Sequence, residues 1–306
     1  MDSCLFCPVR CCMNRNHEYK PYIIAGLVSL FLMILFFLMD QQLLFWIKKL
    51  MNHEFDYMQY KRLYLGTDDP SVPFTEWDFL RFTVFNFPAM GFDTKIIFST
   101  QLFQLFIPLY GVLAGICFYR ERRTVYRFEY FRNCRYRRMI FLKAVKHSVC
   151  AALSVFVPYM LFVIFMRIAT GADPRWFGCM SRTLFDDVLP EGFYLRHIFA
   201  YYVLEGSVRF FLIPSVYAVF SEAAVLISPG FKTAAAAPVL YYYGLSAIGF
   251  SLYWIIPQVS LYVNPSVIMA AGSYSDINTP LIIAINMIPM FIGIMTILKQ
   301  TEYAEI

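Results

Sequence analysis

Charged residues are scarce in this chain. They make up 15% of its 306 residues, whereas 59% are hydrophobic and 19% are aromatic. Soluble domains carry about a quarter charged residues, so this composition excludes an ordinary soluble globular protein and predicts an integral membrane protein. The formal net charge is +5. We do not interpret it as a nucleic-acid signal and expect no nucleic-acid partner, because the basic excess lies in one loop between apolar runs.

The chain also lacks the motifs of hydrolytic enzymes. It has no G-x-x-x-x-G-K-[ST] phosphate loop, since the segment 230–233 (GFKT) has the wrong spacing, and it has no H-E-x-x-H or G-x-S-x-G. The 4 His residues are scattered along the sequence. We therefore expect no catalytic site and no cofactor site in this chain, which predicts that it is not an enzyme.

Half of the 8 cysteines lie within the first twelve residues, at Cys4, Cys7, Cys11 and Cys12. Thiolates with a two-residue gap suit tetrahedral zinc, which makes these four weak candidates for a metal site. The adjacent pair Cys11–Cys12 and the lack of a second well-spaced pair favour ordinary thiols. We expect no disulfide, because the cysteines are concentrated on the side that the charge pattern places inside the cell.

Long apolar runs predict an all-α integral membrane protein with six transmembrane helices. The chain is read as one transmembrane domain, 1–306, with both termini inside. Its expected spans are 22–39, 100–118, 148–167, a part of 199–228, 233–256 and 280–298. We expect 199–228 to hold an outer interfacial helix followed by span 4.

The distribution of Lys and Arg predicts the orientation of these spans, because short loops rich in these residues stay in the cytoplasm. The inner segments would be 1–21, 119–147, 229–232 and 299–306, and the outer segments 40–99, 168–198 and 257–279. The inner set holds fifteen Lys and Arg and the much longer outer set holds nine. The enlarged outer segment 40–99 begins with an amphipathic stretch, 43–51, that suits a helix in the headgroup plane.

The loop 119–147 is the densest basic segment, with ten of the chain's 26 Lys and Arg. Two features inside the spans also stand out. Glu205 and Arg209 are four residues apart in the order that favours a helical ion pair. Gly111 and Gly115 form a small-xxx-small pattern, which lets helices approach closely within one subunit or between two.

Several of these segments resemble the membrane-spanning permease subunit of ABC transporters of the type-2 exporter class, in the divergent form common in Gram-positive bacteria. The likeness covers the six-span layout, the enlarged outer segment, and the loop between spans 2 and 3. There Glu121, Arg132, Tyr136 and Lys143 match an acidic residue, an aromatic and basic helix, and a Lys that opens the next span. The segment 220–238 matches the family's tight inner turn, in which a Ser-containing helix end is followed by a basic residue and then by a helix that carries a Pro.

The resemblance implies a subunit that forms the transport pathway but does not itself hydrolyse ATP. It implies a cytoplasmic coupling helix in 119–147, a separate ABC ATP-binding subunit that carries ATP and Mg, and a second permease copy or a sister permease. It places the protein in the bacterial plasma membrane, where it would export a hydrophobic or amphipathic cargo such as a peptide, a lipid or a drug-like compound. The implied docking residues are Glu121, Arg122, Arg127, Arg132, Tyr136, Arg137 and Arg138.

Three other interpretations stay open. The basic residues of 119–147 would also bind anionic headgroups of the lipid bilayer. The chain would be a stand-alone channel or secondary carrier if polar residues clustered at mid-membrane in several spans. It would be an intramembrane enzyme if His, Ser or Asp side chains converged near the interface. A partner ATPase that copurifies with the chain would favour the permease.

Overall fold

The computed structural model describes residues 15–39, 41–52, 59, 61–62, 66, 69, 71–80, 96, 99–100, 102–123, 136–170, 184–185, 187–190, 192–227, 230–269 and 277–302. This part of the chain is helical and contains no strand. Within it, five helical segments are long and apolar enough to cross a membrane: Tyr19–Leu38, Tyr136–Ile168, Ile198–Ile227, Phe231–Tyr253 and Thr279–Thr301. The all-α membrane class is thus confirmed, whereas six spans with both termini inside stay a prediction.

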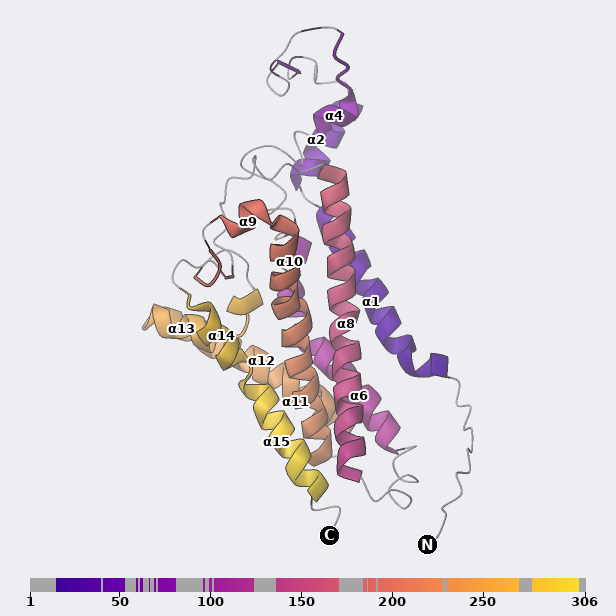
Figure 1. Cartoon of the computed structure of the whole chain (residues 1–306), viewed down its shortest axis with the longest axis vertical. Coiled ribbons are helices and arrows are strands. Elements are labelled where there is room, and N and C mark those ends of the chain that lie inside the picture. The colour runs from indigo at the N-terminus through magenta and orange to yellow at the C-terminus, as the bar shows by residue number, and fades with distance from the viewer. Residues whose placement is uncertain are drawn as a thin grey trace.

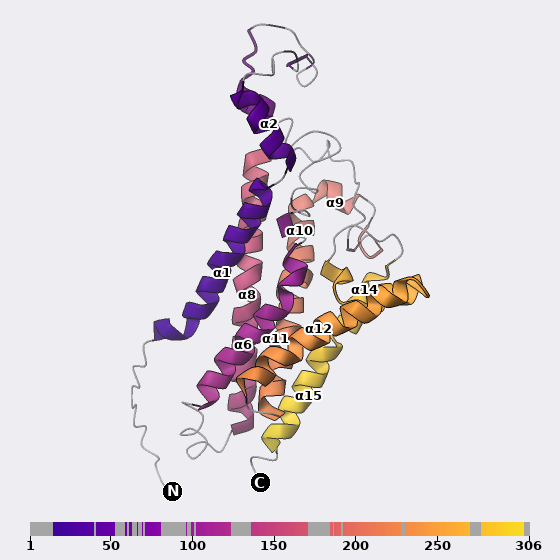
Figure 2. The ribbon, with the colours of Figure 1, turned by 180° about the vertical axis from the view of Figure 1, so that it is seen from behind.

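The helices form an elongated bundle (Figure 1). Helix α1 (Arg15–Leu38) lies along α8 (Tyr136–Thr170), the longest helix. The rod α10 (Ile198–Gly206), η6 (Ser207–Leu212, a π-helix) and α11 (Ile213–Ile227) lies on the other side of α8. Two helices cover α11 further: α12 (Phe231–Tyr253), which leans away from the bundle toward its end (Figure 2), and α15 (Ile288–Glu302). Helix α6 (Ile107–Glu121) packs between α8, α11 and α12.

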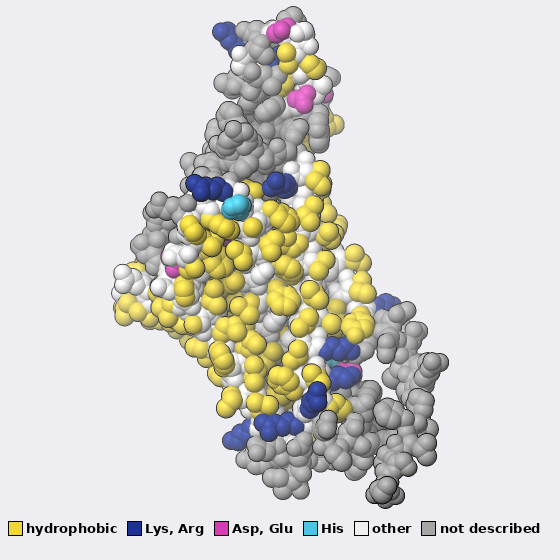
Figure 3. Space-filling view, viewed as in Figure 1, with side chains coloured by type: hydrophobic (Ala, Val, Ile, Leu, Met, Phe, Trp, Pro, Cys, Tyr) yellow, Lys and Arg dark blue, Asp and Glu magenta, His cyan; other side chains and the backbone are white. Residues whose placement is uncertain are grey.

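Figure 3 shows a broad hydrophobic belt with Lys and Arg side chains gathered above and below it. The uncharged stretch of helix α8 indicates how tall this hydrophobic belt is. Its residues 148–166 carry no charged side chain, and Arg167 follows them in the last turn. Nineteen helical residues span about 28 Å, close to the roughly 30 Å hydrocarbon thickness of a bilayer. The belt therefore has the dimensions of a membrane-embedded surface.

In the segment expected as span 2, the regular α-helix is shorter than the predicted span. The segment consists of a 3-10 turn, η3 (Leu102–Leu105), and then α6, whose 15 residues extend about 22 Å. Pro108 lies at one of the first two positions of α6, where its missing N–H and fixed φ favour a helix start. Buried residues recur along one face of α6 at Ile107, Tyr110, Ala114 and Phe118, so the helix packs as an interior element.

Two more boundaries differ from the sequence prediction. Residues 198–227 form one continuous rod rather than an interfacial helix followed by a separate span, since apolar contacts bury much of its length. The last span is interrupted at Met287, between α14 (Thr279–Asn286) and α15, because Pro289 lacks a backbone N–H. Short helices flank the spans, namely α2 (Gln41–Met51), α4 (Glu76–Leu80), α9 (Phe193–Arg196), α13 (Pro257–Val263) and η7 (Val267–Met269).

A separate coupling helix is not seen at the start of α8. The residues 136–147, expected in the cytoplasmic loop, belong to the same unbroken helix as 148–167. They continue the helix because 136–147 contains no Pro or Gly that would stop it. The central part of the loop, 124–135, lies outside the described residues.

Candidate functional site

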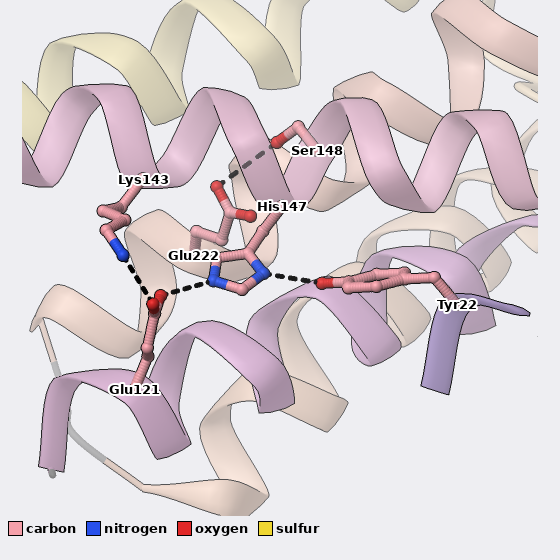
Figure 4. Close-up of polar contacts among 6 residues, drawn as sticks. All are labelled: Tyr22, Glu121, Lys143, His147, Ser148 and Glu222. Carbon is pink, nitrogen blue, oxygen red and sulfur yellow. Dashed lines mark hydrogen bonds and ion pairs between the residues drawn. The ribbon is translucent and has the colours of Figure 1, made fainter. Parts of the chain in front are cut away.

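Four polar side chains from three helices meet where the uncharged stretch of α8 begins (Figure 4). They are Tyr22 of α1, Glu121 of α6, and Lys143 and His147 of α8, which we call the Glu121 cluster. Lys143 and His147 are four residues apart and therefore share one face of α8. Glu121 is the last residue of α6, so the helix end itself delivers its carboxylate to that face.

Both oxygens of the Glu121 carboxylate are used. Lys143 Nζ donates to Oε1 over 2.6 Å, and His147 Nε2 lies 2.7 Å from Oε2. The other His147 nitrogen, Nδ1, lies 2.8 Å from the Tyr22 hydroxyl. A neutral imidazole with its proton on Nε2 satisfies both contacts, because Nε2–H donates to the carboxylate and Nδ1 accepts from the Tyr22 O–H. The cluster thus ties α1, α6 and α8 together.

Burial makes these contacts energetically important. The side chains of His147 and Glu121 are 2% and 13% exposed, and Lys143 is 28% exposed. A buried charge is tolerated only when it is paired and hydrogen-bonded. The Glu121 cluster meets this requirement, since the carboxylate accepts one bond from a cation and another from the imidazole.

The neighbouring residue Arg122 joins the end of α6 to a fourth helix. Its Nη1 donates to the backbone carbonyl of Val225 over 3.0 Å. Val225 lies in the last turn of α11, where carbonyl oxygens have no partner inside the helix and favour a cation. Glu121 and Arg122 therefore link the end of α6 to α8 and α11 through adjacent residues.

Glu222 of α11 is a second acidic group in this region, and it is fully buried. Ser148 Oγ donates to its Oε2 over 3.3 Å, and Oε1 has no hydrogen-bond partner among the described residues. Burying an ionised carboxylate that has only one neutral hydrogen-bond donor would cost on the order of several kcal/mol of folding free energy. This geometry favours the neutral carboxylic acid, which makes Glu222 a group able to hold or release a proton.

The predicted docking residues have different surroundings. Glu121 and Arg122 point into the bundle, as above, and Tyr136 is half-buried against the apolar cluster around Phe118. Arg137 and Arg138 are exposed at the first turn of α8. Arg127 and Arg132 lie outside the described residues. The structure thus brings Glu121 and Arg122 together as internal contacts and leaves Arg137 and Arg138 on the surface.

The Glu205 and Arg209 side chains lie far from this cluster along the rod α10–α11. Arg209 Nη1 donates to Glu205 Oε1 over 2.6 Å, and the two side chains are 4% and 5% exposed. Arg209 Nε also donates to the Ile268 carbonyl over 3.1 Å, and Nη2 donates to the Met269 carbonyl. The pair therefore anchors η7 against the π-helical turn η6, which favours a structural role.

Gly111 is the contact point between α6 and α11. A Cβ at this position would lie 2.7 Å from the backbone carbonyl oxygen of Tyr217, closer than any side chain can approach. Gly115, one turn on, is also buried. Gly111 therefore allows close packing within one chain, whereas a packing role between two subunits stays a prediction.

Sequence reasoning missed Tyr22 and His147 as site residues. A signal existed for His147, because it follows Lys143 by one helical turn, but nothing in the sequence pairs it with Tyr22, 125 residues away. The cysteine candidates Cys4, Cys7, Cys11 and Cys12 lie outside the described residues. Within the described part of the chain, no group of three or more His, Cys, Asp or Glu side chains is placed to hold a metal ion.

The arrangement can thus join four helices mechanically and hold a proton at Glu222. Comparison with known proteins assigns no family, since no family model, curated protein or solved structure matches the chain.

Proposed function

We propose that this chain is the membrane-spanning permease subunit of an ABC-type exporter. A separate ATP-hydrolysing subunit would dock at the end of the bundle where 124–135 joins α6 to α8. ATP and Mg would be held by that partner, and a second permease copy or a sister subunit would complete the pathway. Export of a hydrophobic or amphipathic cargo stays part of this proposal.

One observation carries the proposal: the two ends of the basic segment are bonded to each other and to the rest of the bundle. Glu121 at one end binds Lys143 and His147 at the other. From there His147 contacts Tyr22 of α1, and Arg122 contacts Val225 of α11. A force applied to the segment would therefore reach four helices at once, as an ATP-driven conformational cycle requires.

Exposure divides the basic residues into two roles under this proposal. Arg137 and Arg138 are exposed at the start of α8, on the side where a partner would dock. Glu121 and Arg122 transmit the motion through their internal contacts instead. Docking would thus depend on exposed charge, and coupling would depend on the buried contacts.

The test is copurification from the native membrane. The tagged full-length chain should bring down an ATP-binding subunit and Mg-dependent ATPase activity. Arg137→Glu/Arg138→Glu should remove both, because charge reversal repels an acidic docking surface. Lys232→Glu/Lys299→Glu is the matched control, since both lysines are exposed at helix ends and the charge change is equal. Equal partner recovery and ATPase activity with both double variants would refute docking at this site.

Glu222 favours a second candidate function, a carrier driven by a proton gradient without a partner. Its buried carboxyl group has one oxygen without a hydrogen bond among the described residues, and ionisable residues inside membrane bundles often belong to proton pathways. The chain alone, reconstituted in liposomes, should then move protons or substrate when a pH gradient is applied, and Glu222→Gln should abolish that flux. No flux from the reconstituted chain would rule out this candidate and leave the permease.

A further inference from the structure

Glu222 and the Glu121 cluster lie close together, although Glu222 comes from a fourth helix, α11 (Figure 4). Ser148, whose hydroxyl donates to the Glu222 carboxyl group, directly follows His147 in α8. The Tyr22 hydroxyl interacts electrostatically with the same carboxyl group. Glu222 therefore belongs to the surroundings of Tyr22 and His147.

Exposure falls from one end of this group of side chains to the other. Lys143 and Glu121 are partly exposed at the end of the bundle where Lys and Arg side chains gather. His147 and Tyr22 are buried, and Glu222 is fully buried. The Glu121 carboxylate can thus exchange a proton with water directly, whereas Glu222 needs intermediate groups. Chains of acidic and His side chains serve as such proton relays in membrane bundles.

Each group between water and Glu222 can pass a proton on. In the neutral tautomer described above, His147 Nε2–H donates to Glu121, and Nδ1 accepts from the Tyr22 hydroxyl. When Glu222 gives its proton to the Tyr22 oxygen, Tyr22 passes its own proton to Nδ1, and the Nε2 proton moves to Glu121. Glu121 then releases a proton to water, because the Lys143 ammonium beside it favours the carboxylate.

These transfers leave no charge inside the relay. Glu222 ends as a carboxylate, Tyr22 and His147 end neutral, and the imidazole has changed to its other tautomer. Proton uptake follows the same bonds in reverse, since Glu121 can then protonate Nε2 while Nδ1–H donates to Tyr22. One free proton enters or leaves water for each proton gained or lost by Glu222.

The contacts of Glu222 suit the transfer to Tyr22. Ser148 binds Oε2, whereas Oε1 has no hydrogen-bond partner among the described residues. A rotation of the Glu222 side chain towards the Tyr22 hydroxyl would complete the chain of hydrogen bonds. The other titratable groups that face this hydroxyl are the thiols of Cys117 and Cys150, which are weak donors and acceptors.

We infer that Tyr22, His147 and Glu121 form a proton path between Glu222 and the water at the basic end of the bundle. The path deepens the second candidate function and rests on it for the use of the proton that Glu222 carries. It assigns the cluster a chemical role in addition to its mechanical one.

The test is hydrogen–deuterium exchange at the Glu222 carboxyl group, followed by infrared spectroscopy of the full-length chain in phosphatidylcholine membranes. The C=O stretching band of a neutral acid moves to lower frequency when deuterium replaces its proton, and Glu222→Gln identifies the band by removing it. Tyr22→Phe and His147→Phe should each slow the exchange by about 100-fold or more, since a positioned proton-transfer group contributes about that factor.

Tyr253→Phe and His197→Phe are the matched controls, because both side chains are exposed and lie outside the Glu121 cluster. They should leave the exchange rate unchanged. Equal rates in test and control variants would overturn the path, and so would the absence of a Glu222 acid band from the unmodified protein. Tyr22→Phe keeps the test decisive if His147→Phe does not fold.

This measurement is separate from the liposome flux that tests the carrier. Slowed exchange in the two test variants supports the path even if the chain alone moves no protons across a membrane. Unchanged exchange overturns the path even if the chain does move them.

Discussion

Removing the Glu121 carboxylate is the most direct perturbation of the site. In Glu121→Ala, Lys143 loses an acceptor at 2.6 Å and His147 Nε2 loses one at 2.7 Å. Hydrogen bonds to charged groups contribute about 1.5–3 kcal/mol each. Lys143 is 28% exposed and water replaces part of its contact, whereas His147 is 2% exposed and its nitrogen would be left unpaired. We expect the free energy of unfolding to fall by about 2–4 kcal/mol.

Glu121→Gln tests the contribution of the negative charge, because it removes the charge and keeps the size and shape of the side chain. The amide oxygen can still accept from Lys143, and the amide N–H can donate to His147 in its other neutral tautomer, which then donates from Nδ1 to Tyr22. We expect a loss of about 1–2 kcal/mol, smaller than in Glu121→Ala. Tyr22→Phe should cost a similar amount, because it leaves His147 Nδ1 buried without a partner.

The assay is reversible unfolding of the full-length chain in mixed micelles of mild detergent and SDS, followed by helix content. Glu76→Ala is the control, because Glu76 is exposed and its removal should change the free energy by no more than about 0.5 kcal/mol. If Glu121→Ala destabilised the protein no more than Glu76→Ala, the cluster would not join the helices as described. If Glu121→Gln were as severe as Glu121→Ala, charge and not contact geometry would dominate.

Three further predictions concern the yield of folded protein and the free energy of unfolding. Gly111→Leu should prevent correct folding, because its Cβ would lie 2.7 Å from a backbone oxygen. Gly244→Leu is the control and should be tolerated, since nothing lies within 4 Å of a Cβ at that position. Equal yields of folded protein for the two variants would contradict the close packing at Gly111. Arg209→Met should cost about 3–5 kcal/mol, because the buried Glu205 carboxylate loses the cation that lies beside it. Adding Glu205→Gln should recover part of this loss, and no recovery would mean that the two residues are not coupled. Glu222→Gln should change stability by less than about 1 kcal/mol, because an amide mimics a neutral acid; a larger loss would indicate an ionised Glu222.

The sequence predicted the apolar spans well because their signal is local. Hydrophobic runs at 22–39, 148–167 and 233–256 correspond to α1, α8 and α12, although α1 begins 7 residues and α8 begins 12 residues before the predicted span. The ion pair Glu205–Arg209 was also within reach, since a four-residue spacing implies one helix face. In these cases the residues that decide the structure are close in the chain.

Features that depend on distant residues were not predictable. A uniform span length does not show that α6 is short and interior, because its burial comes from α8, α11 and α12. The sequence presents Glu121 as a docking residue beside a basic loop, whereas the fold turns it toward His147 and Lys143. The sequence also does not show that Glu222 is fully buried beside Ser148, because 74 residues separate the two in the chain. Each difference reflects which helices become neighbours.

The unbroken course of α8 has a mechanical consequence. Its 35 residues form a rod of about 52 Å, with His147 near one end and Arg167 near the other. A rigid rod turns a small tilt into a large displacement, so that about 10° of rotation would move its far end by about 9 Å. The rod has one weak point, Pro158, where a backbone hydrogen bond is missing and bending is easiest. A displacement of the first turn of α8 would thus change the position of its C-terminal end. The helix would either tilt as a rigid rod or bend at Pro158.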